Sequence, residues 1–274
     1  AVRDKSDAIE HLKKLMEEAG VPVTPGTEGN LAGVDEAVDV AAQIGYPVML
    51  KATSGGGGRG IRRCDSEDDL RRQFGRVVSE ATKAFGRADV FLEKCIVNPR
   101  HIEAQILADS HGNVIHLYER DCSIQRRNQK LIEIAPSPQL TPEQRSYIGE
   151  LAVRAAEAVG YENAGTVEFL LADNQIYFME MNTRVQVEHT ITEQITGVDI
   201  VREQIRIASG LTLGYRQEDI SYRGYALQFR VNAEDPKNDF LPSFGKISRY
   251  YAPGGPGVRT DTAIYTGYSI PPYF

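Results

Sequence analysis

The sequence has no tryptophan, only three cysteines and no apolar run near the roughly 18 to 20 residues that a membrane-spanning helix needs. No signal peptide is recognisable at its start. Cys64, Cys95 and Cys122 are widely spaced and odd in number, so they form neither a CxxC zinc pattern nor a disulfide framework. We therefore expect a protein of the reducing cytoplasm with no membrane span.

Positive charge is also in deficit. The chain has 31 Lys plus Arg against 38 Asp plus Glu, a net charge of −7. An acidic chain argues against non-specific nucleic-acid binding, so we expect no nucleic-acid partner. A hydrophobic share of 41% and a charged share of 25% argue against disorder. With 274 residues, the chain can form two compact units or one large unit with a smaller lobe.

The chain begins without Met and stops at Pro271-Pro272-Tyr273-Phe274. From these ends we expect an excised or incomplete piece of a longer protein.

The first part of the sequence indicates a small α/β lobe. Apolar periodicity predicts helices over residues 4–19, 35–44 and 66–86, strands over 47–52 and 90–92, and a loop over 53–60. We interpret residues 1–22 as a linker helix and residues 23–95 as this lobe.

The second part, residues 96–274, indicates a mostly antiparallel sheet carrying helices, which makes the fold class α+β. The predicted strands and helices lie at 102–108, 114–119, 142–159, 166–171, 176–181, 190–209 and 225–232. Thr141, Pro142 and Gln144 form the entry signature of the 142–159 helix. Gly197 is expected to interrupt the 190–209 helix.

A glycine-rich loop, Lys51-Ala-Thr-Ser-Gly-Gly-Gly-Gly-Arg-Gly60, directly follows a predicted strand. Four consecutive glycines pack no side chain, but they let backbone N–H groups approach an anion closely. The loop lacks the Gly-Lys-Ser/Thr ending of a P-loop. We interpret it as a phosphate loop that Lys51 can assist, with a flexible surface hairpin as the alternative.

A carboxylate pair is predicted from a hairpin whose turn is Asp173-Asn174-Gln175. With Asn174 at the midpoint, the register pairs Glu168 with Glu180, Leu170 with Phe178 and Ala172 with Ile176. Opposed carboxylates repel each other unless a cation lies between them. Together with Asn182, the pair suits Mg²⁺, which prefers oxygen ligands. A chance pairing of solvated glutamates is the alternative.

Several cations follow: Arg126, Arg127, Lys130, Arg184 and Arg230. Each alone is more often a surface charge than a ligand. Beside a phosphate loop and a metal pair they suggest a pocket for a planar oxyanion such as bicarbonate. Glu188 is a candidate general base, whereas His189 is interpreted as a structural residue.

These segments together resemble the biotin carboxylase branch of the ATP-grasp superfamily, over essentially the whole chain. The resemblance is closest to the biotin carboxylase subunit of two-subunit pyruvate carboxylases. It rests on the glycine loop and on Glu93-Lys94, Asn98-Pro-Arg-His-Ile-Glu103, Glu119-Arg-Asp-Cys-Ser-Ile-Gln-Arg-Arg127, Glu180-Met-Asn-Thr-Arg-Val-Gln-Val-Glu-His189 and Asn232-Ala-Glu-Asp-Pro236. It implies an ATP-grasp fold in which residues 23–95 are the lid and residues 96–274 are the catalytic lobe with the start of a carboxyl-terminal domain. By this resemblance, we expect the family's amino-terminal α/β domain and the end of its carboxyl-terminal domain to be missing from this sequence.

The resemblance also implies a role for each matching residue. The nucleotide would be bound by Lys5, Lys51, the backbone of Gly57 and Gly58, Glu93, Lys94, Ile96, His101, Gln125 and Asn128. Magnesium, or Mn²⁺, would be held by Glu168, Glu180 and Asn182. Bicarbonate would be bound by Lys130, Arg184 and the backbone of Val187. Glu188 would deprotonate it, and Arg230 would stabilise the biotin enolate.

In the implied reaction, bicarbonate attacks the γ-phosphate of ATP to give carboxyphosphate, which breaks down to CO₂ and phosphate beside biotin. Phosphate removes the ureido proton, and N1′ takes the CO₂. The implied partners are a carboxyltransferase subunit, a biotin carrier domain and a second copy of the chain, and the implied final acceptor is pyruvate. Two positions depart from the family: Asn128 replaces a usual His, and Arg3-Asp4-Lys5 replaces Gly-Asp-Lys.

Two other readings remain open from the sequence. One is a different ATP-grasp ligase, such as a carbamoyl-phosphate or amino-acid ligase, although the Arg184–Glu188 motif argues against it. The other is a nucleotide-binding module without turnover.

Overall fold

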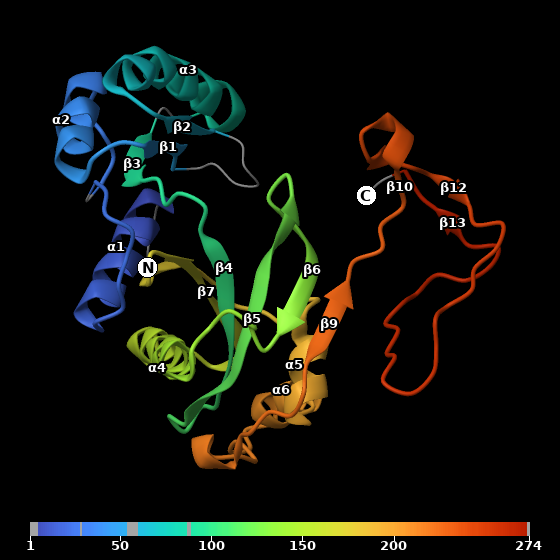
Figure 1. Cartoon of the computed structure of the whole chain (residues 1–274). Helices are drawn as coiled ribbons and strands as arrows, with labels where there is room; N and C mark the ends of the chain where they lie inside the picture. The colour runs from blue at the N-terminus through green and yellow to red at the C-terminus, as the bar shows by residue number, and fades with distance from the viewer. Residues whose placement is uncertain (1–4, 28, 54–59, 87–88, 273–274) are drawn as a thin grey trace. The chain divides into compact units, whose positions relative to one another are not determined.

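The computed structural model describes residues 5–27, 29–53, 60–86 and 89–272. The chain divides into two compact units, Ala1–Phe229 and Arg230–Phe274. Figure 1 traces both, and the first unit contains the two larger sheets. The glycine loop that we predict from the sequence, residues 54–59, lies outside the described residues.

A six-stranded antiparallel sheet is the framework of the first unit (Figure 1), with strand order β8-β7-β4-β5-β6-β9. Its strands are β4 (Arg100–Ala108), β5 (Val114–Arg126), β6 (Gln129–Ala135), β7 (Asn163–Ala172), β8 (Gln175–Asn182) and β9 (Ala226–Phe229). On β4, Ile102 and Ala104 alternate with Glu103 and Gln105, so one face is apolar and the other is polar. The predicted antiparallel α+β architecture is therefore confirmed.

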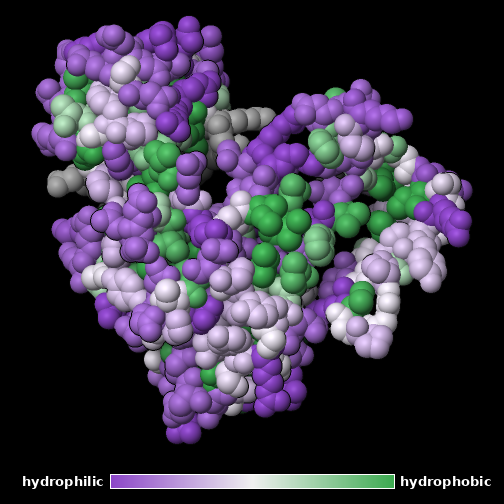
Figure 2. Space-filling view, in the orientation of Figure 1, coloured by the Kyte–Doolittle hydropathy of each residue, from purple (hydrophilic) through white to green (hydrophobic). Residues whose placement is uncertain are grey.

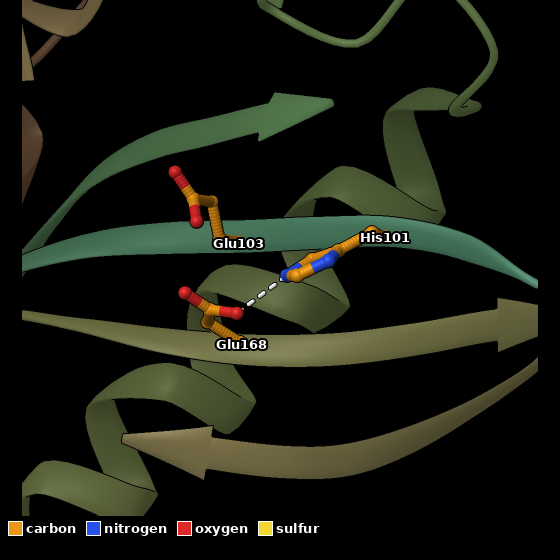
Figure 3. A group of neighbouring side chains, drawn as sticks. All are labelled: His101, Glu103 and Glu168. Atoms are coloured by element: carbon orange, nitrogen blue, oxygen red, sulfur yellow. Dashed lines mark hydrogen bonds and ion pairs between the residues drawn. The ribbon is translucent and has the colours of Figure 1, made fainter. Parts of the chain in front are cut away.

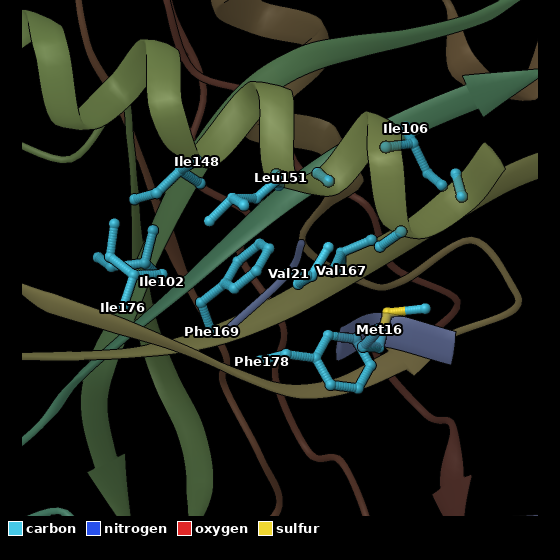
Figure 4. Packing of buried hydrophobic residues seen from close by; sticks show 14 of the residues in the cluster. Met16, Val21, Ile102, Ile106, Ile148, Leu151, Val167, Phe169, Ile176 and Phe178 are labelled. Carbon is cyan, nitrogen blue, oxygen red and sulfur yellow. The ribbon is translucent and has the colours of Figure 1, made fainter. Parts of the chain in front are cut away.

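The apolar face packs against α1 (Lys5–Glu18) and α4 (Pro142–Ala158). The α4 capping box is formed as predicted: Gln144 N–H donates to Thr141 Oγ1 at 3.2 Å, and Thr141 N–H donates to Gln144 Oε1 at 3.0 Å. Figure 4 shows the core beneath α4, where Phe169 and Phe178 meet edge to face with ring centroids 6.5 Å apart. This core fixes the strands whose opposite side chains form the polar site.

The other face of the sheet contacts α5 (His189–Thr196) and α6 (Ile200–Ala208). Gly197 separates these helices with φ 75°, a left-handed conformation that glycine adopts without a Cβ clash. The predicted interruption is confirmed, and α5 itself begins directly after Glu188 and ends before Gly197.

The smaller lobe has a three-stranded antiparallel sheet, ordered β2-β1-β3. Its elements are α2 (Val34–Ile44), β1 (Val48–Ala52), β2 (Ile61–Cys64), α3 (Glu67–Phe85) and β3 (Val90–Lys94). Ser66 caps α3 by accepting a hydrogen bond from Asp69 N–H at 3.3 Å. These helices and strands share a core of their own, separate from the one beneath α4.

Strands β5, β6 and β9 of the central sheet differ from the sequence prediction. Residues 120–126 extend β5, and β6 is a strand that we do not predict. The strand predicted over 225–232 is shorter in the structure, where β9 spans only Ala226–Phe229. Leu227 and Phe229 are 54% and 62% exposed, and Figure 2 shows apolar surface around the position of β6 and β9.

The second unit has only short elements: β10 (Glu234–Asp235), η2 (Pro236–Asn238), β11 (Leu241–Pro242), β12 (Gly245–Lys246) and β13 (Ser269–Ile270). A further 3₁₀ turn, η1 (Gln217–Asp219), belongs to the first unit. Among the described residues, no helix combines the length and apolar character needed to cross a bilayer.

Candidate functional site

Four charged residues form a row across the polar face of the central sheet. Arg120 on β5 pairs in register with Glu103 on β4, Glu103 with Glu168 on β7, and Glu168 with Glu180 on β8. Three adjacent carboxylates on neighbouring strands repel one another unless cations or donors compensate them. The surroundings of the row supply that compensation.

Lys130 is the central cation of the site. Its ammonium donates to Glu103, to Glu168 Oε1 at 2.8 Å and to Glu188 Oε1 at 2.8 Å. Burial alone would lower the pKa of the Lys130 ammonium, but attraction to these carboxylates outweighs burial and raises its pKa. Lys130 is therefore a fixed positive charge at neutral pH, surrounded by three acids.

Glu168 is held by four donor side chains. Its Oε1 accepts from Lys130, from Asn182 Nδ2 at 2.9 Å and from Gln186 Nε2 at 2.8 Å. Its Oε2 lies 2.5 Å from His101 Nε2 (Figure 3). Burial favours the neutral acid, but the bond from His101 and the charge of Lys130 lower the pKa of Glu168 to about 2. Glu168 is thus an ionised, buried carboxylate.

His101 is oriented by Gln125, whose Nε2 lies 2.8 Å from His101 Nδ1. With the Gln125 amide donating, Nδ1 accepts and Nε2–H points at Glu168. Gln125 pairs in register with Lys130 across the β5–β6 hairpin. The hairpin that we do not predict therefore brings two of the predicted residues to the site.

The predicted pairing of Glu168 with Glu180 is confirmed, but the register behind it is different. Asp173 and Asn174 alone make a two-residue turn, with φ 49° and 62°, so Ala172 pairs with Gln175. The predicted pairings of Leu170 with Phe178 and of Ala172 with Ile176 are wrong. A register shift between Glu168 and Phe169 restores the offset, so the two glutamates meet.

The predicted magnesium ligands offer oxygen atoms on two adjacent strands. Asn182 Nδ2 lies 2.9 Å from Glu168 Oε1 and 3.2 Å from Glu180 Oε1, so one amide reaches both carboxylates. Glu180 is exposed, whereas Glu168 is buried. The two carboxylates, one of them facing solvent, fit Mg²⁺, which keeps waters and phosphate oxygens as further ligands. Asn182 would join them by turning its amide oxygen toward the ion, since its nitrogen now contacts both carboxylates.

A second group of ligating atoms, from His101, Glu103 and Glu168, lies within 4.8 Å (Figure 3). It includes a nitrogen, and two of its carboxylates already accept from Lys130. This group fits Mg²⁺ less well than the pair with Glu180.

The segment between β8 and α5 carries the remaining predicted bicarbonate residues. Glu188 is 2% exposed, precedes α5 and accepts from Lys130. Val187 is 59% exposed. Arg184 is exposed, its Nη1 donates to Val185 O at 3.2 Å, and it lines a shallow pocket of about 370 Å³ with Tyr161 and Ile205. Lys130 and Glu188 are therefore brought together, whereas Arg184 is engaged with a backbone carbonyl of its own loop.

Glu93, on β3 of the small lobe, lies between two lysines. Lys13 Nζ lies 2.5 Å from Glu93 Oε1, and Lys51 pairs with Oε2. Burial favours the neutral acid, but attraction to Lys51 and Lys13 lowers the pKa of Glu93. Both lysines also lie over the Phe91 ring, at 5.5 and 5.9 Å from its centroid.

The other predicted nucleotide residues lie in several places. Lys94 Nζ donates to the carbonyls of Gly45 and Tyr46 at 2.8 and 3.1 Å, and Ile96 is partly buried just after β3. Asn128 is exposed in the β5–β6 turn with φ 62°, a conformation that asparagine tolerates better than most residues.

The roles of all the predicted site residues remain predictions, and four of these residues have no described position at the site. The Lys5 side chain, Gly57 and Gly58 lie outside the described part of the structure. Arg230 opens the second unit and has no described position relative to this site.

Sequence reasoning missed Glu103, Arg120, Gln186 and Lys13 as members of these clusters. Glu103 carried a signal, because a charged residue between Ile102 and Ala104 on a buried strand needs a partner. Arg120 lies in a tract that we do not predict as strand. Lys13 carried no signal, since its contact with Glu93 joins a helix to a strand distant in sequence.

Two known families match the chain. "Carbamoyl-phosphate synthase L chain, ATP binding domain" matches residues 7–216, and "Biotin carboxylase C-terminal domain" matches residues 228–274. The first match covers more than half of the chain, and the second begins beside the boundary between the two units.

Similar curated proteins agree with these matches. The chain is 60% identical over 263 residues to the 2-oxoglutarate carboxylase small subunit of Hydrogenobacter thermophilus, covering 96% of this chain and 56% of that protein. It is 57% identical over 262 residues to a pyruvate carboxylase subunit of Methanothermobacter thermautotrophicus, covering 96% of this chain and 53% of that protein. The chain thus spans about half the length of the curated relatives it matches.

Among solved structures, the biotin carboxylase domain dimer of the Hydrogenobacter thermophilus 2-oxoglutarate carboxylase, in complex with MgADP, ADP and bicarbonate, has a TM-score of 0.90. Its sequence identity is 58%, and the match covers 99% of this chain and 59% of that chain. The chain belongs to the carbamoyl-phosphate synthase L chain ATP-binding family, and it is a member of the biotin carboxylase branch of the ATP-grasp superfamily.

Proposed function

We propose that the protein uses ATP and bicarbonate to carboxylate biotin on a carrier protein, as the first half-reaction of a biotin-dependent carboxylase. One observation carries this proposal: the Lys130 ammonium is bonded both to Glu188, the proposed base, and to Glu168, the proposed metal ligand. A cation joining a base to a metal ligand suits the activation of a small oxyanion beside a nucleoside triphosphate.

Glu188 and Lys130 would act on bicarbonate itself. Lys130 attracts the oxyanion, and Glu188 accepts its proton. A bicarbonate oxygen then forms a bond to the γ-phosphorus while the bond between that phosphorus and the β,γ-bridging oxygen breaks, releasing ADP and leaving carboxyphosphate. Cleavage of the carboxyphosphate C–O bond gives CO₂ and phosphate. Phosphate takes the ureido proton of biotin, and the ureido nitrogen forms the new bond to CO₂.

Glu168, Glu180 and Asn182 would hold Mg²⁺, or Mn²⁺, which neutralises charge on the phosphate oxygens when bound. The exposed carboxylate of Glu180 leaves a solvent-facing side at which phosphate oxygens can approach. His101 and Lys130 keep the Glu168 carboxylate ionised, and the bond from Gln186 helps to fix its orientation.

Nucleotide binding would use the small lobe. Lys51 would exchange its bond with Glu93 for a phosphate oxygen, while Lys13 stays on Glu93. The backbone of Gly57 and Gly58, with Lys5, would complete the phosphate contacts. Glu93, Lys94 and Ile96 would line the base, and His101, Gln125 and Asn128 would lie nearer the ribose.

Arg184 and Arg230 would divide the work. Arg184 would turn from Val185 O to grip bicarbonate with the Val187 backbone, and Arg230 would stabilise the biotin enolate. Arg184→Ala should therefore abolish bicarbonate-dependent ATP cleavage. Arg230→Ala should keep much of the cleavage and lose carboxybiotin, as parallel assays of ADP and carboxybiotin would show. Equal loss of both products in both variants would contradict this division.

The proposed partners are a carboxyltransferase subunit, a biotin carrier domain and a second copy of the chain. The relatives named for pyruvate and 2-oxoglutarate support a 2-oxo acid as final acceptor, with pyruvate as our proposal. We propose a cytoplasmic location, which the three buried free cysteines support.

The direct test supplies the protein with ATP, Mg²⁺, ¹⁴C-bicarbonate and free biotin. We expect acid-labile carboxybiotin and ADP in equal amounts. Bicarbonate-dependent ADP release without carboxybiotin would favour a carbamoyl-phosphate or other ATP-grasp ligase. Binding of ATP without any ADP release would favour a nucleotide-binding module.

A further inference from the structure

Arg120 is the largest fully buried side chain among the described residues, and its five N–H groups meet five acceptors. Nε donates to Glu103 Oε1 at 2.6 Å. Nη1 donates to Gln105 Oε1 at 2.8 Å and to Thr192 Oγ1 at 2.9 Å. Nη2 donates to Thr166 Oγ1 at 3.2 Å and to Gln186 Oε1 at 3.1 Å. The guanidinium is completely satisfied by protein atoms.

These acceptors join four separate parts of the site. Glu103 and Gln105 come from β4, and Thr166 comes from β7. Thr192 lies on α5, the helix that begins directly after Glu188. Gln186 lies two residues before Glu188 and donates its own Nε2 to Glu168. Arg120 therefore ties the sheet to both sides of Glu188.

Arg120 also provides a second positive charge to the buried carboxylates. Glu103 accepts from Arg120 through Oε1 and from Lys130 through Oε2. In the contacts described above, Arg120 and Lys130 share Glu103. Without Arg120, Lys130 alone would balance the Glu103 charge, so the Lys130 ammonium would move toward Glu103. A buried acid that loses one of two cationic partners binds the other more strongly.

With its side chain wholly buried, Arg120 has no surface to offer a substrate. We propose that Arg120 is a positioning residue for bicarbonate activation: it fixes the loop and helix on either side of Glu188, and it shares Glu103 so that Lys130 stays centred between Glu168 and Glu188. This inference rests on the proposed function.

The first test compares Arg120→Lys and Arg120→Met with Arg145→Met. Arg145 is the control, because this α4 residue, with a side chain 12% exposed, pairs at 2.9 Å with buried Glu119 of β5, outside the site. We expect the Arg120 variants to lower kcat/KM for bicarbonate in ATP cleavage by roughly 10- to 100-fold. Kd for ATP without bicarbonate should stay within about twofold of wild type. Arg145→Met should lower the melting temperature and leave both constants unchanged.

A milder pair of variants covers the case in which the Arg120 variants do not fold. Thr192→Val removes one acceptor of Arg120 and keeps the side-chain shape, and Thr192→Ser keeps the hydroxyl. We expect Thr192→Val to lower kcat/KM for bicarbonate by about 3- to 10-fold, and Thr192→Ser to restore most of it. A purely structural role would lower the melting temperature of Thr192→Val without changing this constant.

The inference is overturned when folded Arg120→Lys and Thr192→Val keep the wild-type kcat/KM for bicarbonate. It is also overturned when these variants and Arg145→Met lose the same activity in proportion to their stability. Wild-type protein without bicarbonate-dependent ATP cleavage would instead refute the proposed function, so the two failures are distinguishable.

Discussion

The first unit contains two buried ion clusters of opposite composition. In the central sheet, Lys130 lies among Glu103, Glu168 and Glu188, so the acids outnumber the ammonium. In the small lobe, Glu93 lies between Lys13 and Lys51, so the ammonium groups outnumber the acid. A surplus of acid attracts a metal ion, and a surplus of lysine attracts phosphate. This difference in charge supports our proposal that the central sheet holds the metal ion and the small lobe holds the phosphates of the same metal–nucleotide complex.

The largest effect should follow from removing the central ammonium. Lys130→Met leaves three buried carboxylates with one cationic partner fewer and deprives bicarbonate of its counter-charge. We expect bicarbonate-dependent ATP cleavage to fall about 10³-fold. Lys83→Met, at an exposed lysine of α3, is the control and should retain activity. A Lys130→Met enzyme within tenfold of wild type would remove Lys130 from the mechanism.

The next effect distinguishes the two carboxylates among the three proposed metal ligands. Glu168→Gln removes a buried carboxylate bonded to four donors, whereas Glu180→Gln removes an exposed one. We expect the Mg²⁺ concentration that gives half-maximal ATP binding to rise about 100-fold for Glu168→Gln and about 10-fold for Glu180→Gln. Calorimetric titrations of ATP at several Mg²⁺ concentrations measure this value. An unchanged Mg²⁺ dependence in both variants would refute the metal pair.

A smaller effect tests the lysine-rich cluster. In Lys13→Met, Glu93 loses one of its two lysine partners and should bind Lys51 more tightly. Lys51 should then exchange Glu93 for a phosphate oxygen less readily. We expect Kd for ATP to rise about 5-fold. Lys14→Met is a matched control, because Lys14 is exposed on the same helix. Equal affinities of the two variants for ATP would show that Lys13 has no part in nucleotide binding.

The smallest effect is the pH dependence of the same cluster. The pKa of Glu93 is lowered in the folded protein, because Lys51 and Lys13 outweigh the effect of burial. A lowered folded-state pKa stabilises the protein above the unfolded pKa of about 4.3, and this stabilisation is lost as pH falls through the folded pKa. The melting temperature of Glu93→Gln should therefore lie below that of wild type at pH 7 and approach it below pH ~4. A difference that stays constant with pH would exclude the ion pairs as its cause.

Local signals were enough to predict much of the fold and part of the site. The capping box of α4, the break at Gly197 and the facing of Glu168 and Glu180 all follow from short-range patterns, and the structure confirms them. The β7–β8 hairpin shows where such patterns fail. Its turn is one residue shorter than predicted, and the register shift between Glu168 and Phe169 offsets that difference, so Glu168 still pairs with Glu180. Neither feature can be read from alternation alone.

Contacts between distant segments were not predictable in the same way. Arg120 lies in a charged tract whose strand character depends on pairing with β4 and β6. Its acceptors Thr166, Gln186 and Thr192 lie 46 to 72 residues away in sequence. Lys13 reaches Glu93 from a helix whose pattern predicts only an apolar face. Such pairs depend on how the elements pack, which tertiary structure decides.

In the proposed reaction, a bicarbonate oxygen attacks the γ-phosphorus of ATP at the Lys130 and Glu188 site. The most direct test runs the protein with ATP, Mg²⁺, biotin and ¹⁸O-labelled bicarbonate, and measures the mass of the released inorganic phosphate. We predict one ¹⁸O atom per phosphate, because the attacking oxygen stays on phosphorus when carboxyphosphate releases CO₂. Unlabelled phosphate, formed at the same rate with and without bicarbonate, would mean that water attacks ATP and would contradict this mechanism.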